Sequence, residues 1–96
     1  MRTYLAQEEE KAIYQNYLEG VYGRMKILNF GARLHHRFFE MKTSRGGRAV
    51  FARLKDKVGS FDVLLFHQEV HLNPLALKRK TLNQLGRWMR KKARHE

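Results

Sequence analysis

Cysteine is absent from this chain of 96 residues, and proline occurs only once, at Pro74. The absence of cysteine excludes a disulfide scaffold, a thiol nucleophile and cysteine-ligated zinc. No apolar run approaches the roughly 20 residues that a helix needs to cross a bilayer, and residues 1–11 are acidic and polar rather than signal-like. We therefore expect a cytoplasmic protein with no membrane partner.

Acidic side chains are also scarce, because nine Asp and Glu residues face 20 Lys and Arg residues and leave a net charge of +11. Residues 1–20 carry a net charge of −2, whereas residues 77–96 hold eight basic residues and one acidic residue. A charge of this size on a small protein attracts nucleic acid, anionic membranes or acidic protein surfaces. We expect the basic partner surface at the C-terminal end of the chain.

Apolar material is sufficient for one core. Hydrophobic residues make up 43% of the chain and aromatic residues 11%, which is more than a disordered chain carries. A chain of this length forms one domain with a modest core rather than an elaborate active-site cleft. No internal repeat and no linker divides the sequence, so we expect a single domain over residues 1–96.

Apolar side chains recur at helical spacing through most of the sequence. The pattern predicts helices at Gln7–Leu28, at Ala32–Lys42, over residues 50–58, at Phe61–Leu72 and from Asn73 to about Arg94. Within the fourth segment, Val63 to Phe66 alone would also suit a buried strand, and we favour the helix. Asn73 is a good N-cap, and Pro74 loses no useful hydrogen bond at a first helical position. The sequence therefore predicts an all-α domain of four to five helices that ends in a long basic amphipathic helix.

The last predicted helix carries the strongest functional pattern, because an apolar arc lies opposite a basic side. A basic face with Trp88 beside it suits phosphate contacts and stacking on bases. An apolar stripe with a basic rim also suits docking into a protein groove, and a core helix with a solvated outer face is the alternative. The candidate partner-binding residues on this helix are Trp88 and the cations Lys78, Arg79, Arg87, Arg90, Lys91, Lys92 and Arg94.

Three further candidates lie outside that basic side. Arg45 and Arg48 belong to a glycine-rich segment, Thr43–Arg48, which we expect to be a flexible loop. There the two guanidinium groups would meet phosphates or carboxylates, although a plain solvated loop is favoured. Pro74 is expected to open the last helix in trans. Its alternative role is as a binding or isomerisation handle, because only an X–Pro bond samples cis appreciably.

Catalytic and metal-binding patterns are incomplete. His67 and His71 are four residues apart and would reach one metal ion on a helix, but Gln68 occupies the place where a zincin needs its glutamate base. No third ligand is suggested. The adjacent residues His35 and His36 would point in different directions on a helix. We expect neither catalysis nor a cofactor or bound metal.

Two segments carry a family resemblance: HLNPLALKRK at His71–Lys80 and LNFGARL at Leu28–Leu34. Together with the length and the basic balance, they resemble the second anti-RecBCD protein family of Salmonella-type lambdoid phages, over the whole chain. The resemblance implies a non-catalytic protein of the host cytoplasm that binds the host RecBCD helicase–nuclease through its RecC subunit. Such a protein modifies the activity of RecBCD and its response to Chi sites, which protects phage DNA ends and favours phage recombination.

The single proline and the net positive charge suggest further partners. A host peptidyl-prolyl isomerase acting at Pro74 is a further candidate partner, since this is the only proline. At +11 the chain is no acidic mimic of DNA, so inhibition of RecBCD would come from docking on the enzyme beside its DNA. The basic helix would then meet an acidic patch or DNA phosphates. A small basic protein that binds DNA or RNA directly is the alternative function.

Overall fold

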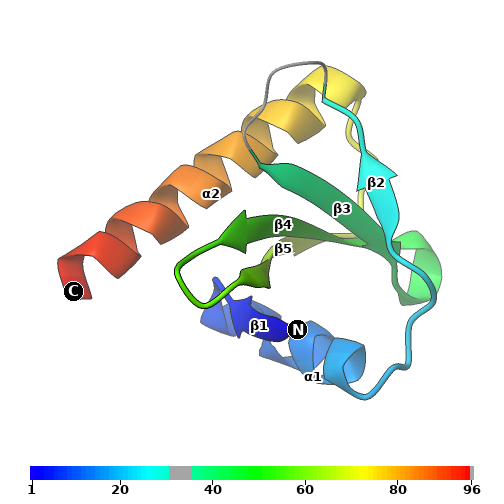
Figure 1. The fold of residues 1–96 in the computed structure, drawn as a ribbon. Coiled ribbons are helices and arrows are strands. Elements are labelled where there is room, and N and C mark those ends of the chain that lie inside the picture. Colours follow the sequence, from blue (N-terminus) through cyan, green and yellow to red (C-terminus); the bar gives the residue numbers. More distant parts are fainter. Residues whose placement is uncertain (31–35, 96) are drawn as a thin grey trace.

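The computed structural model of the chain describes residues 1–30 and 36–95. Its elements are β1 (Arg2–Leu5), η1 (Glu8–Glu10), α1 (Lys11–Leu18), β2 (Lys26–Leu28), β3 (Arg37–Lys42), η2 (Ser44–Gly46), β4 (Arg48–Lys55), β5 (Ser60–Gln68) and α2 (Pro74–His95), where η marks a short 3₁₀ helix. The strands form one sheet, with α2 across one face and α1 on the other (Figure 1). The all-α prediction is therefore wrong, because the described chain is a mixed α/β fold.

The sheet has the strand order β1-β5-β4-β3-β2, with β1 parallel to β5 and the other neighbouring pairs antiparallel. Phe51 is the partner of Leu64 and Val50 is the partner of Phe66, so Leu65 is an extra residue on β5. A bulge of this kind breaks the alternation of side chains between the two faces. As a result, Leu65 and Phe66 both join the core beneath α2.

Two predicted helices are strands in the structure. Residues 50–58 contain most of β4, and Phe61–Leu72 contains most of β5. Helices cover both faces of the sheet, so these strands lack the polar alternation of a half-exposed strand. In β5 the six consecutive residues from Phe61 to Phe66 are all buried. Without a period of two, the remaining spacing of apolar residues imitates a helix.

The first two predicted helices are also wrong in part, since η1 and α1 cover half of the first and no helix lies in the described part of the second. Gln7–Leu28 contains one helix of eight residues, α1, and the chain then turns at Gly20, whose φ is 73°, before it forms β2. The described part of Ala32–Lys42 is His36 and strand β3. Residues 31–35, which include His35, lie outside the described residues. In β3, Phe38 packs with the core beneath α2 and the next residue, Phe39, with the core beneath α1.

The last predicted helix is confirmed as α2. The Oδ1 of Asn73 accepts a hydrogen bond from the Ala76 backbone N–H at 2.9 Å, which caps the helix, and the Asn73–Pro74 bond is trans. Leu77, Thr81 and Leu85 face the sheet and are buried. Most of the apolar stripe that the sequence offered to a protein groove therefore packs on the protein's own sheet, whereas Leu75 and Met89 stay exposed.

The predicted flexible loop at Thr43–Arg48 is a packed turn. The Thr43 backbone N–H donates to the Gly47 carbonyl at 2.9 Å, and Gly46 has a φ of 77°. The Thr43 hydroxyl lies 2.7 Å from Nε2 of His67. A Cβ on Gly47 would lie 2.5 Å from Thr43 Oγ1 and 2.6 Å from His67 Nε2. The turn therefore requires glycine at position 47 for space, and glycine at position 46 for its backbone angle.

The variant Gly47→Ala is expected to lower the free energy of unfolding by about 1–3 kcal/mol, because the added methyl group must push Thr43 and His67 apart. Urea denaturation measures the loss. Gly23→Ala is the matched control, because a Cβ on Gly23 meets nothing within 4 Å, and its stability should change little. Equal stabilities for the two variants would contradict the packed turn.

Candidate functional site

Helix α2 carries a dense charge of one sign, since none of its residues from Pro74 to His95 is acidic. The cations Arg79, Arg87, Arg90 and Lys91 are exposed, and Lys78, Lys80 and Lys92 are half-buried. Among the described residues, no salt bridge joins any of these seven side chains to a carboxylate. Their charges are therefore available to an anionic partner.

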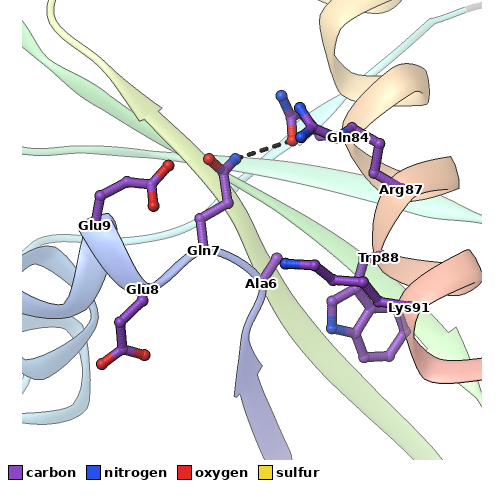
Figure 2. Close-up of a pocket in the computed structure, with 8 residues that line it drawn as sticks. All are labelled: Ala6, Gln7, Glu8, Glu9, Gln84, Arg87, Trp88 and Lys91. Carbon is purple, nitrogen blue, oxygen red and sulfur yellow. Dashed lines mark hydrogen bonds between the residues drawn. The ribbon is translucent and has the colours of Figure 1, made fainter. Parts of the chain in front are cut away.

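A cleft of about 260 Å³ separates the β1–η1 connection from α2 (Figure 2). Gln7 crosses it and donates from Nε2 to Oε1 of Gln84 at 3.0 Å and to the Leu65 carbonyl at 2.7 Å. These bonds tie the N-terminal segment to the helix and to the sheet. The charged residues that line the cleft are Glu8, Glu9, Arg87 and Lys91. Two acidic and two basic side chains balance, so this cleft is a poor site for an anion.

A larger groove along α2 adjoins this cleft, shares Gln84 and Arg87 with it, and has only basic residues among its charged groups. Arg79, Lys80, Arg87 and Arg90 supply its charged groups, and no acidic residue lines it. We call these four cations the basic groove. They span about three helical turns, or roughly 16 Å along the helix axis. Gly86 lies in the middle of the groove, and a Cβ there would lie 3.2 Å from Nη1 of Arg90. A row of cations on one side of a helix fits a row of phosphates.

A third hollow, here called the aromatic pocket, lies where the β4–β5 hairpin meets the C-terminal half of α2. Its volume is about 230 Å³. It is lined by His36, Leu54, Lys55, Phe61, Trp88, Met89, Lys92 and Ala93. This lining combines aromatic rings with two lysines and contains no carboxylate.

Lys92 lies over the rings beside this pocket. Its Nζ is 5.1 Å from the ring centroids of both Phe61 and Trp88 and 5.3 Å from that of Tyr4, which is within cation–π range. Tyr4 stands edge-on to Phe61 with centroids 5.3 Å apart, and Trp88 lies 6.0 Å from Phe61. Rings from β1, β5 and α2 thus form one cluster with an ammonium group over it.

The hairpin beside the aromatic pocket is held by an ion pair. Nη1 of Arg2 lies 3.0 Å from Oδ2 of Asp56, whose carboxylate also accepts from the Val58 backbone N–H at 2.9 Å. The hydrogen bond from Arg2 holds the pKa of Asp56 well below its ordinary value, and the same contact raises the pKa of Arg2. The charge of Asp56 is therefore compensated by Arg2 and not by the lysines of the pocket.

Only part of the predicted site comes together. Arg48 begins β4, at the opposite end of that strand from Lys55, and its Nη1 lies 3.1 Å from Oε2 of Glu40. Arg48 is therefore engaged elsewhere. The side chains of Arg45 and Arg94 lie outside the described part of the structure. Pro74 is exposed at the first residue of α2.

Other elements bring residues to α2 that no helical pattern in the sequence indicated. Tyr4 comes from β1, Lys55 from the end of β4 and Phe61 from the start of β5. None of them is near Trp88 in the sequence. The usable pattern was the hairpin turn at Asp56–Gly59, where Gly59 has a φ of 143°. That turn would have paired the flanking segments and placed Lys55 opposite Ser60 and Leu54 opposite Phe61.

The histidine pair does not form the helical arrangement that would bind one metal ion. His67 lies on β5, and His71 is exposed in the connection that leads to α2. Among the described residues, no group of three or more His, Asp or Glu side chains could hold a metal ion. Within residues 1–30 and 36–95, no helix is both long enough and apolar enough to cross a membrane.

Comparison of the chain with known proteins finds no matching family model, no matching curated protein and no matching solved structure.

Proposed function

We propose that the protein is a non-catalytic binder of nucleic acid and that the basic groove of α2 is its main contact surface. The observation that carries the proposal is a helix of 22 residues without an acidic side chain, whose described cations form no salt bridge. The apolar stripe of the same helix packs on the sheet. The side left to solvent therefore suits phosphates better than it suits an apolar protein groove.

The dependence of binding on salt tests this proposal. Each phosphate contact releases counterions, so four contacts from the basic groove should give a slope of about −3 in log K against log salt for a single strand. Fluorescence anisotropy with labelled single-stranded DNA, duplex DNA and RNA, between about 50 and 200 mM salt, measures the slope. Absent binding, or binding that salt leaves unchanged, would overturn the proposal.

A second proposal is that the protein docks on host RecBCD through RecC and alters its activity and Chi response. Its support is the family resemblance and one structural observation: Leu75 and Met89, at 59% and 44% exposure, stand on α2 among the cations. A protein partner would cover these apolar side chains, whereas phosphates would not. An acidic surface on RecC, or the DNA that RecBCD holds, would meet the cations.

Purified components separate the two proposals. Nuclease-treated RecBCD and the protein should co-elute in gel filtration if docking is direct, and Leu75→Ser should weaken that complex without changing DNA affinity, because Leu75 lines neither the basic groove nor the aromatic pocket. Failure to co-elute would remove the RecBCD proposal and leave direct nucleic-acid binding in place. A prolyl isomerase remains a proposed third partner, supported by the exposure of Pro74. Pro74→Ala should abolish capture of that isomerase while α2 persists.

A further inference from the structure

We infer that the aromatic pocket receives one unpaired base of a single-stranded nucleic acid, and that Lys92 moves from the rings to the phosphate of that nucleotide. The inference rests on the proposed nucleic-acid binding and names its substrate class as single-stranded. It assigns a role to a pocket that lies apart from the basic groove.

The size of the pocket limits its occupant. A volume of about 230 Å³ is below the roughly 300–1,000 Å³ of sites for drug-sized ligands. One flat group of the size of a nucleobase suits this space, and an oligonucleotide does not. The exposed side chain of Met89 and the half-buried ring of Trp88 supply apolar surface on which such a group can stack, and the buried ring of Phe61 lies beneath them.

The charge of the pocket selects an anionic ligand. Lys55 and Lys92 are in its lining without a carboxylate, and the hairpin carboxylate, Asp56, is paired with Arg2. A cationic ligand would meet two lysines at the pocket and the nearby guanidinium of Arg2. A nucleotide combines a flat base with a phosphate, so it matches both the rings and the lysines.

Lys92 is placed to exchange its contact with the aromatic rings for a contact with a phosphate. Its Nζ lies 5.1 to 5.3 Å from three ring centroids, and no described carboxylate forms a salt bridge with it. An incoming base takes over the ring surface that the ammonium covers, and the released ammonium lies beside the phosphate of the same nucleotide. Bases within a duplex are stacked and paired, so only an unpaired base can enter.

The tryptophan count makes this inference directly measurable. Trp88 is the only tryptophan in the chain, so tryptophan emission comes from one residue, which lines both the aromatic pocket and the charge-balanced cleft. The two lysine variants below separate these two hollows. Three probes separate stacking from charge: a short oligothymidine, an abasic strand of the same length and a blunt-ended hairpin duplex. We expect oligothymidine to quench Trp88 emission, and the abasic strand and the duplex to bind with little quenching. Oligouridine in the same assay shows whether RNA enters as well as DNA.

Two adjacent lysines give a matched pair of variants. Lys92→Met and Lys91→Met remove the same charge from the same helix, but Lys91 lines the charge-balanced cleft instead. We expect Lys92→Met to weaken oligothymidine binding about fivefold, and Lys91→Met to weaken it clearly less. Circular dichroism checks that both variants keep the fold.

The results of these assays separate base binding in the aromatic pocket from nucleic-acid binding by the basic groove. Oligothymidine that binds without quenching Trp88, or equal quenching by the abasic strand, overturns the pocket and leaves nucleic-acid binding by the basic groove intact. Equal weakening by Lys91→Met and Lys92→Met also overturns it, because the charge alone would then account for the effect. A failure of all strands to bind overturns both this inference and the proposed function.

Discussion

The triple variant Arg79→Glu, Arg87→Glu, Arg90→Glu is expected to bind single-stranded nucleic acid at least about 100-fold more weakly than the unaltered protein near physiological salt. Three of the four cations of the basic groove reverse, so phosphate contacts are replaced by repulsion. The slope of log K against log salt should become less negative by about 2 for a single strand, because three phosphate contacts are lost. Fluorescence anisotropy measures both quantities, and the three side chains are exposed, so the fold should persist.

A control variant with the same change in net charge tests whether the position of the cations matters. Arg24, Lys26 and Lys42 are also exposed and none of them lines a hollow beside α2. Their replacement by glutamate changes the net charge from +11 by the same six units as the groove variant. The control should lose far less affinity. If both variants weaken binding equally, net charge alone attracts the nucleic acid, and α2 is no specific contact surface.

The variant Asp62→Ala is expected to lower the free energy of unfolding by about 2–3 kcal/mol. Asp62 is 3% exposed on β5, and Arg53 on β4 meets it through two hydrogen bonds of 2.7 and 3.0 Å. Loss of the carboxylate leaves a guanidinium against the ring of Phe39, whose centroid is 4.4 Å from Cζ of Arg53. The loss is below that of a fully buried pair, because the Arg53 side chain keeps 31% exposure and solvent can still reach it.

A double variant distinguishes loss of the pair from loss of packing. Arg53→Met with Asp62→Leu replaces the pair by apolar groups and should be much closer to the unaltered protein, because no charge is then left unpaired. Urea denaturation compares the three proteins. If Asp62→Ala is as stable as the double variant, the unpaired guanidinium of Arg53 does not lower the free energy of unfolding.

The end of the chain could be predicted from its sequence because its structural determinants are local. Asn73 caps α2, Pro74 begins it, and Leu77, Thr81 and Leu85 repeat every four residues toward the sheet. These features need no knowledge of distant residues. The choice of α2 as the charged surface depends on composition alone, so it too could be made from the sequence.

The sheet could not be predicted by the same means, because burial on both faces removes the period that identifies a strand. In β4, the four residues from Ala49 to Ala52 are all buried, two in each core cluster. The bulge at Leu65 further disturbs the spacing in β5. Enrichment in phenylalanine and valine is the remaining strand indicator in these segments, and it is weaker than the helical spacing of their apolar residues.

The aromatic pocket was beyond prediction for a different reason. Tyr4, Phe61 and Trp88 become neighbours only through the parallel pairing of β1 with β5 and the docking of α2. No local pattern records either event. The basic residues of the C-terminal helix and Trp88 were therefore identified from the sequence, whereas Tyr4 and Phe61 were not.

The pairing of β1 sets an order of events during translation. Arg2 pairs with Phe61, and β5 is the neighbour of β1 in the described sheet. A ribosome adds roughly 5–20 residues per second, so β1 waits roughly 3–13 s for the last residue of β5 to be made. The hairpins of the antiparallel strands can form earlier, because their contacts are close in sequence. The strand synthesised first is thus the last of the five to gain its partner.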